Sequence, residues 1–278
     1  MRILVIGAKG MLGSELCGVF GTQYETLAWD LEEIDITDRI EARKRLLDAR
    51  PDLIVNTAAF VDMEACEADP EKAWLVNAVG AQNLALAAAE MDCRLLYISS
   101  DYIFDGAAVV PYDEVSRPNP LNQYGRSKLA GEQFCLQACR RAYSVRTAWL
   151  FGHAPNNYVQ RVLTAADKDG IVRMPSDQVE SPTYTRHLAS AIRDLIETEA
   201  YGVYHITSRQ ACTRAEFARF VLQESGRGEP VEVVDAKILQ RTTARPAYAV
   251  LNCQHFELVA GQRLPHWHEA VRAYLRVS

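Results

Sequence analysis

Short apolar segments alternate with longer amphipathic segments through the first 150 residues, and this alternation constrains the fold more than any other feature of the chain. The predicted strands are Ile3–Ile6, Glu25–Trp29, Leu53–Val55, Leu95–Ile98 and Tyr143–Thr147, and helices are predicted over about 11–20, 38–48, 70–90 and 122–141. Strands that alternate with helices of this length build a mainly parallel sheet with helices on both faces. We therefore predict a doubly wound α/β fold.

The second half of the chain is less regular. Prolines interrupt the pattern between positions 155 and 182, whereas Tyr201–Ile206 is predicted as one more strand that returns to the main sheet. Further helices are predicted over 213–225 and 265–275. We expect one domain from residues 1–150, rejoined by about 180–208, and a smaller lobe that interleaves with it, from about 151–180 and 209–278.

The composition excludes several classes of protein. The 278 residues include 36 acidic and 30 basic side chains, for a net charge of −6, and no Lys/Arg block is present, so we expect neither nucleic acid nor an anionic membrane as a partner. No apolar run approaches the roughly 18 residues of a membrane-spanning helix. The first segment reaches Gly7 after one basic residue, too early for a secretory signal, and we expect a cytoplasmic protein.

The cysteines and histidines do not predict a metal site. The seven cysteines are scattered and include no C-x-x-C pair, so we expect reduced, structural thiols. His266 and His268 are separated by one residue, but no further histidine or cysteine lies near them in the sequence. We favour surface packing for this pair over metal binding.

Glycines follow the first predicted strand with the spacing G-x-x-G-x-x-G, in the segment Gly7-Ala8-Lys9-Gly10-Met11-Leu12-Gly13. Such glycines allow a tight turn, let the backbone approach a pyrophosphate, and let the next helix pack closely on the sheet. A glycine triplet alone is weak evidence, because turns favour glycine in any case. Its place between the first strand and the first helix predicts a dinucleotide site of the Rossmann type.

Two residues point to different dinucleotides. Asp30 ends the second predicted strand, where a carboxylate accepts from the ribose 2′-hydroxyl of NAD and repels the 2′-phosphate of NADP. Lys9 lies inside the glycine loop, where its ammonium favours NADP by reaching that phosphate. Each also has a plain structural interpretation, a strand-end cap for Asp30 and a solvated side chain for Lys9. The sequence leaves NADH and NADPH both open.

Tyr124 and Lys128 form a Y-x-x-x-K pair at the start of the helix predicted between the fourth and fifth strands. A spacing of four residues puts both side chains on one helix face. A nearby ammonium favours phenolate, so we expect Lys128 to lower the pKa of Tyr124 towards the range of a general acid. Lys128 is also placed to hold the nicotinamide ribose.

The segment Ser99-Ser100-Asp101 ends the fourth predicted strand, at the carboxyl edge where open parallel sheets bind ligands. A hydroxyl there can donate to a substrate carbonyl and polarise it, although a single serine at a strand end is more often a cap. The glycine loop, the strand-end serine and the Tyr–Lys pair occur in the expected order on the expected elements. Together they favour a functional site over three unrelated structural features.

With these elements in place, the chain resembles the extended short-chain dehydrogenase/reductase superfamily and, more narrowly, the dTDP-4-dehydrorhamnose reductase family. The resemblance covers most of the chain. Besides the glycine loop it rests on Asn56–Asp62, Ser99–Gly106, Pro120–Lys128, Arg146–Trp149, Asp177-Gln178, Ser181–Thr183 and Arg245-Pro246. The S-S/T-D-Y-x-F-D-G and D-Q-x-x-x-P-T patterns are fairly specific within the superfamily.

The resemblance implies hydride transfer from NADPH or NADH to the 4-keto carbon of a nucleotide-linked deoxysugar, with dTDP-L-rhamnose or a close relative as product. It implies that Tyr124 protonates the nascent alkoxide, that Ser100 hydrogen-bonds the carbonyl where the family usually has threonine, and that Lys128 tunes the tyrosine and holds the ribose. Further implied contacts are Asp35, Ile36, Ala58 and Ala59 with the dinucleotide, and Asp101, Tyr102, Phe104, Trp149, Asn157 and Arg245 with the sugar nucleotide. The main domain would bind the dinucleotide and the smaller lobe the substrate.

Some members of the family bind magnesium at a dimer interface through glutamates. Glu15 fits such a ligand, but Arg186 stands where a second ligand would align, so Mg²⁺ is a doubtful cofactor here. A homodimer is a family expectation.

Two alternatives stay open beside the reductase. One is another nucleotide-sugar epimerase, reductase or dehydratase, although Tyr102 follows Asp101 where dehydratases tend to have a second acid. The other is a non-catalytic NAD(P)-binding subunit, similar to the regulatory subunit of methionine adenosyltransferase. The intact Tyr124 and Lys128 favour an enzyme over this second alternative.

Overall fold

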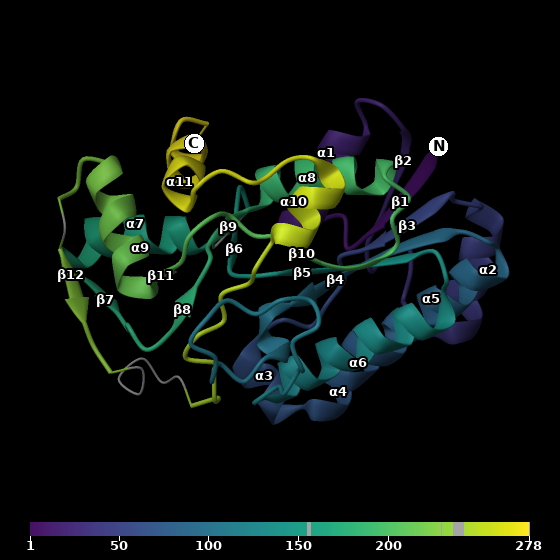
Figure 1. Cartoon of the computed structure of the whole chain (residues 1–278), viewed down its shortest axis with the longest axis horizontal. Coiled ribbons are helices and arrows are strands. Elements are labelled where there is room, and N and C mark those ends of the chain that lie inside the picture. The colour runs from purple at the N-terminus through teal and green to yellow at the C-terminus, as the bar shows by residue number, and fades with distance from the viewer. Residues whose placement is uncertain (155–156, 229, 236–241, 278) are drawn as a thin grey trace.

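The central sheet confirms the predicted doubly wound α/β fold (Figure 1). The computed structural model describes residues 1–154, 157–228, 230–235 and 242–277, and within them six parallel strands have the order β2-β1-β3-β4-β5-β10. The strands are β1 (Arg2–Ile6), β2 (Glu25–Trp29), β3 (Leu53–Asn56), β4 (Arg94–Ser100), β5 (Ala142–Thr147) and β10 (Gly202–His205). Strand β10 pairs with β5 in parallel, so the predicted return of the chain to the main sheet is confirmed.

Helices cover both faces of the sheet, which explains why the strands are nearly continuous apolar runs. On one face Ile3 and Val5 pack against α1 (Met11–Phe20) and α8 (Thr185–Glu197). On the other face Leu4 and Ile6 pack with α2 (Arg39–Ala49), α5 (Ala81–Glu90) and α6 (Gln123–Ala138). Figure 1 shows these two groups of helices on opposite sides of the strands.

The helix predicted over 70–90 is confirmed, with one irregular turn in its middle. It consists of α4 (Pro70–Trp74), a π-helical turn over Leu75–Gly80, and α5, and a short helix, α3 (Met63–Ala68), precedes it. Within the π-helical turn, Asn77 exchanges hydrogen bonds with the backbone of Phe60 at 2.7 and 2.9 Å and donates to Ser127 at 3.0 Å. The irregular turn therefore ties the segment after β3 to helix α6.

The second half of the chain forms a separate cluster of buried side chains at the end of the molecule far from β1 and β2 (Figure 1). Besides α8 and β10, the second half of the chain contains β6 (Leu150–Phe151), α7 (Tyr158–Asp169), β7 (Val172–Met174), β8 (Val179–Glu180), β9 (Thr183–Tyr184), β11 (Cys212–Thr213), α9 (Arg214–Glu224), β12 (Val231–Val233), α10 (Gln254–Ala260) and α11 (Trp267–Leu275). The predicted helices over 213–225 and 265–275 correspond to α9 and α11. Helices α7, α8 and α10 were not predicted. Of these, α8 and α10 pack on the main sheet.

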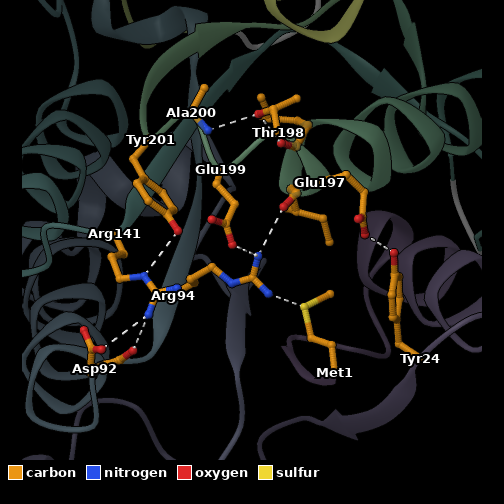
Figure 2. A network of polar contacts seen from close by, with 12 residues as sticks. Met1, Tyr24, Asp92, Arg94, Arg141, Glu197, Thr198, Glu199, Ala200 and Tyr201 are labelled. Carbon is orange, nitrogen blue, oxygen red and sulfur yellow. Dashed lines mark hydrogen bonds and ion pairs between the residues drawn. The ribbon is translucent and has the colours of Figure 1, made fainter.

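The amino ends of the strands carry a network of polar contacts, shown in Figure 2. Arg94, at the start of β4, donates to the carbonyl of Ile196 at 3.2 Å and lies 3.7 Å from the carboxylate of Glu199. Arg141 donates to the carbonyl of Asp92 at 2.9 Å and to the Tyr201 hydroxyl at 3.2 Å. These contacts join the starts of β4 and β5 to the link between α8 and β10.

Two further expectations concern the chain as a whole. All seven cysteines are free thiols, as predicted. In the described part of the chain, no helix has the length and apolar character needed to cross a membrane.

Candidate active site

Two adjoining pockets lie at the carboxyl ends of the parallel strands and share Gly10, Thr57 and Ala59 in their walls. The β2 pocket, of about 560 Å³, is lined from the ends of β1, β2 and β3. The β4 pocket, of about 440 Å³, is lined from the glycine loop and the ends of β4 and β5. The chain passes from β1 to β2 on one side of β1 and then crosses to β3 on the other side, so the strand order reverses at β1. Sheets of this kind bind ligands at the point of such a reversal.

The loop has no room for a side chain at its first and third glycines. Gly7 has a φ of +81°, and a Cβ there would lie 2.7 Å from the backbone nitrogen of Ala58. A Cβ at Gly13 would lie 2.1 Å from the carbonyl oxygen of Gly7, so helix α1 packs directly on the turn. Gly10 is the N-cap of α1 and brings no side chain, so the first N–H groups of the helix can meet a phosphate. The loop therefore fits a dinucleotide.

The wall of the β2 pocket contains residues that were predicted to contact the dinucleotide: Lys9, Asp30, Asp35, Ile36, Ala58 and Ala59. Asp30 accepts from the backbone N–H of Lys9 at 2.8 Å, which links the end of β2 to the glycine loop. The Lys9 ammonium lies 2.7 Å from the carboxylate of Glu32, and this contact raises the pKa of Lys9. Glu33 adds a further carboxylate near that ammonium.

Ser100, Tyr124 and Lys128 meet in the wall of the β4 pocket, together with Met11, Leu12, Asp101, Tyr102 and Trp149. Asn122 caps α6 by accepting from the Gly125 N–H at 2.8 Å. A Cβ at Gly125 would lie 2.1 Å from the carbonyl oxygen of Tyr102, so this glycine lets α6 approach the end of β4. The close approach brings the Tyr124 phenol beside the Ser100 hydroxyl, which acts to lower the pKa of Tyr124.

Burial dominates the electrostatics of the Tyr–Lys pair. The Lys128 ammonium donates to the carbonyl of Ile98 at 2.6 Å and lies 4.2 Å from the centre of the Tyr97 ring. Burial lowers the pKa of Lys128 to about 7. Burial raises the pKa of Tyr124, and the lowering expected from Lys128 is not found. The loss of water around the phenol outweighs the attraction of an ammonium that is already bonded to a carbonyl.

The sequence interpretation missed Glu180 and Arg214, which complete the β4 pocket from the second half of the chain. Arg214, the first residue of α9, donates to Glu180 at 2.8 Å, and its guanidinium lies 3.7 Å from the centre of the Trp149 ring. Gln178 donates to the other Glu180 oxygen at 3.0 Å. Gln178 belongs to the D-Q-x-x-x-P-T pattern of the sequence, and Glu180 lies within that pattern, so the pattern could have indicated it. No local pattern marks Arg214.

Trp149 has a strained backbone at the pocket wall. Its φ is 38°, in the left-handed region that a bulky side chain rarely adopts. The Trp149 carbonyl accepts from the Thr183 N–H at 3.0 Å, and the stacked Arg214 guanidinium holds the ring. Strained conformations of this kind concentrate at functional sites.

Phe104, Asn157 and Arg245, which the resemblance assigned to the substrate, are not among the residues that line either pocket. Phe104 is fully buried and stacks on Tyr112 with ring centres 4.1 Å apart. Asn157 is buried at the start of α7, where its side chain caps the helix. Arg245 lies 3.3 Å from the carboxylate of Glu64 on α3.

Within the described ranges, no group of three or more His, Cys, Asp or Glu side chains is arranged to hold a metal ion. Glu15 and Arg186 both lie beside Tyr184 and act on its pKa in opposite directions. His266 accepts from the backbone N–H of His268 at 3.1 Å and caps α11, which agrees with the packing role favoured for this pair.

The comparisons with known proteins agree on one family. Residues 1–278 match the family model described as the RmlD substrate binding domain. The chain is 36% identical to the spore coat polysaccharide biosynthesis protein SpsK of Bacillus subtilis, over 99% of this chain and 97% of that protein. It is also 36% identical to the dTDP-4-dehydrorhamnose reductase of Mycolicibacterium smegmatis, over 98% of this chain and 84% of that protein.

A solved structure gives the same result. The crystal structure of dTDP-4-dehydrorhamnose reductase from Bacillus anthracis in complex with NADP superposes with a TM-score of 0.96 at 31% identity, covering 100% of this chain and 99% of that one. The full-length family match, the curated relatives and this superposition lead to the same conclusion, which is that the chain belongs to the RmlD substrate binding domain family.

Proposed function

We propose that this protein reduces the 4-keto group of dTDP-4-dehydro-L-rhamnose to give dTDP-L-rhamnose, with NADPH or NADH as the hydride donor. The observation that carries the proposal is the meeting of Ser100, Tyr124 and Lys128 in a pocket that adjoins the glycine-loop pocket. The names of relatives at 31–36% identity support the choice of substrate.

The bound dinucleotide supplies the hydride, and the side chains of the chain supply polarisation and a proton. Ser100 donates to the carbonyl oxygen of the substrate and favours the build-up of negative charge there. Tyr124 gives its phenolic proton to that oxygen as the alkoxide forms. Its raised pKa keeps the phenol protonated until the alkoxide, a stronger base, develops. Lys128, buried beside it, holds the ribose and stabilises the phenolate in its charged form.

We infer that residues 1–150 with about 180–208 bind the dinucleotide, and that the rest of the chain binds the sugar nucleotide. Arg214 supports this division, since it comes from the second half of the chain and lines the β4 pocket, with its guanidinium stacked on Trp149. Phe104, Asn157 and Arg245 stay predictions as substrate contacts, at positions outside that wall.

We also infer a preference for NADH over NADPH. The carboxylates of Asp30, Glu32 and Glu33 all lie close enough to act on the Lys9 ammonium, and Lys9 is paired with Glu32. One ammonium among three carboxylates repels a 2′-phosphate more than it attracts one. The test is the ratio of kcat/KM for the two dinucleotides. We expect the variant Glu32→Gln, with Glu41→Gln on α2 as a matched control, to shift that ratio towards NADPH.

The remaining partners and the location are proposed on the composition and the first segment of the sequence, and the homodimer on the resemblance alone. We propose a cytoplasmic homodimer that binds its nucleotide sugar without nucleic acid or Mg²⁺. Sedimentation analysis of the purified chain tests the dimer, and dialysis against a chelator followed by an activity assay tests independence from Mg²⁺.

The proposed reaction is tested by following the nicotinamide absorbance of the purified protein with dTDP-4-dehydro-L-rhamnose and each dinucleotide. We expect the absorbance to fall and dTDP-L-rhamnose to appear. Tight binding of the dinucleotide without any oxidation would contradict the reductase. It would move the assignment to a different keto-sugar or to a non-catalytic NAD(P)-binding subunit, which would copurify with a partner protein.

A further inference from the structure

The hydrogen bonds of Ser100 raise a question that the proposed reaction leaves open. The Ser100 hydroxyl has one proton and two lone pairs. It has three neighbours: the backbone N–H of Tyr102, whose nitrogen lies 3.1 Å away, the Asp101 carboxyl at 3.0 Å, and the Tyr124 phenol. The Tyr102 N–H can only donate, so it takes one lone pair. The other lone pair and the single proton remain for Asp101 and Tyr124.

The charge on Asp101 decides which of the two neighbours of Ser100, Asp101 or Tyr124, receives the Ser100 proton and which donates to its remaining lone pair. If Asp101 is ionised, it can only accept a hydrogen bond, so Ser100 donates to Asp101 and must accept from Tyr124. The hydroxyl protons of Ser100 and Tyr124 would then both point away from a substrate carbonyl. If Asp101 is a neutral acid, it donates to Ser100, and the serine proton points towards Tyr124 and the pocket. The phenolic proton of Tyr124 is then free for the substrate.

The surroundings of Asp101 favour the neutral acid. Its side chain is buried, and its second oxygen, Oδ2, is inaccessible to solvent and has no hydrogen-bond partner among the described residues. Glu180 on β8 is also buried, and its charge and that of Arg214 on α9 both act on Asp101. Arg214 is bonded to Glu180 at 2.8 Å. Two buried carboxyls beside one guanidinium cannot both hold a charge at low cost.

The other polar groups that face Asp101 do not offset this. Tyr102, its neighbour in the chain, is hydrogen-bonded to Gln178, and Tyr124 comes from α6. Burial and the charge of Glu180 raise the pKa of Asp101 well above its usual range, against smaller contributions from Ser100 and Arg214. The burial of Asp101 and the excess of carboxyls over cations around it therefore both favour a neutral Asp101.

We propose that Asp101 is a neutral carboxylic acid at working pH and a positioning residue, which donates to Ser100 and thereby directs the serine hydroxyl into the pocket. Asp101 then donates to Ser100, and Ser100 donates towards Tyr124, so these hydrogen bonds all run in one direction. Glu180 and Arg214 keep Asp101 neutral, because the Arg214 guanidinium is paired with Glu180 and does not compensate a charge on Asp101. This inference rests on the proposed reduction for its kinetic consequence, but the protonation state of Asp101 can be measured without substrate.

The first experiment is infrared difference spectroscopy of the full chain with ¹³C-labelled aspartate, wild type against Asp101→Asn, at neutral pH. We expect a protonated carboxyl band in the wild type that is missing in the variant. Asp113→Asn, at an exposed position of the following loop, is the matched control and should keep the band. Absence of the band from the wild type would overturn the inference, whatever the enzyme turns over.

The second experiment separates positioning from a merely structural role. In Asp101→Asn an amide can still donate to Ser100 but cannot ionise, whereas Asp101→Leu keeps the bulk and removes the donor. We expect the Asn variant to retain kcat within a few-fold and the Leu variant to lose about 10²-fold, the usual effect of losing an aligned donor. The wild type should lose kcat as pH rises through the ionisation of Asp101, and the Asn variant should lack that loss.

Three results would contradict the positioning role: an Asn variant as inactive as the Leu variant, identical pH profiles for wild type and the Asn variant, or an unimpaired Leu variant. Dinucleotide binding, measured by fluorescence quenching, confirms that each variant is folded. If the wild type itself fails to reduce the sugar, the proposed function fails, and the infrared result still decides the state of Asp101.

Discussion

The two edges of the central sheet handle polar groups in opposite ways. At the amino edge, Arg94 and Arg141 are partly buried, and their donors meet carbonyls and carboxylates close by (Figure 2). At the carboxyl edge, Asp101 and Lys128 are removed from water, and buried polar atoms such as Asp101 Oδ2 lack partners. The same strands therefore carry a stabilising network at one end and a group of destabilised side chains at the other. Such a difference is what a reactive site requires.

The first and largest effect is expected from matched tyrosine substitutions at the two edges. Tyr124→Phe removes the proposed proton donor, and we expect kcat to fall by about 10²–10⁴-fold, the usual contribution of general acid catalysis. Tyr24→Phe removes a hydroxyl that is hydrogen-bonded to Glu197 at the amino edge, and kcat should not change. Steady-state kinetics on both variants gives the comparison, and equal losses would refute it.

The second effect concerns the buried ion pair that supports the carboxyl edge. Glu132, one turn after Lys128 on α6, lies 2.6 Å from Arg146 on β5, and both side chains are buried. Breaking such a pair leaves an uncompensated charge, so Glu132→Gln should lower the free energy of unfolding by about 3–5 kcal/mol. Urea denaturation measures this, with Glu41→Gln in an exposed pair on α2 as the control. A loss below about 1 kcal/mol would show that the buried pair behaves like a surface one.

The third effect is a dependence of stability on pH. The pKa of Lys128 is lowered from 10.5 to about 7 in the folded chain, so between these values the unfolded chain binds more protons, and stability rises with pH. Lys128→Met removes this dependence. We expect the variant to be more stable than the wild type at pH 7, by a margin that shrinks as the pH rises towards 10. Lys44→Met, at an exposed position on α2, controls for the loss of one lysine. A margin that is constant over this range would contradict the effect of burial.

The smallest effect is expected from Arg141→Ala at the amino edge. Its side chain is 37% exposed and bonds the carbonyl of Asp92 and the Tyr201 hydroxyl. Solvent competes for such contacts, so the free energy of unfolding should fall by about 1 kcal/mol or less. Activity should stay unchanged. A large loss of kcat, with stability preserved, would mean that the two edges are coupled.

The sequence allowed a prediction of those features that depend on local spacing. The glycine loop, the strand-end Ser100 and the Tyr124–Lys128 pair all lie on elements that their own residues specify, and each lies where it was expected. The helix over 70–90 was predicted, but its π-helical turn was not, because there Asn77 bonds to Phe60 and Ser127, which are distant in sequence. Amphipathic periodicity carries no information about such contacts.

The rest of the site depends on packing between distant segments. Glu180 and Arg214 reach the pocket from β8 and α9, and no motif connects them. The raised pKa of Tyr124 has the same origin, because it depends on how much water the assembled walls exclude. Spacing could predict that Lys128 would lie beside Tyr124, but not that burial would outweigh its charge.

The most direct test of the account is the fate of the hydride. The protein is incubated with dTDP-4-dehydro-L-rhamnose and NADH deuterated at the nicotinamide C4, and the sugar product is analysed by NMR. We predict dTDP-L-rhamnose with deuterium at C4 of the sugar, formed by the wild type and at least about 10²-fold more slowly by Tyr124→Phe. A product without deuterium at C4, or equal rates for the two proteins, would contradict reduction at the carboxyl edge of the sheet.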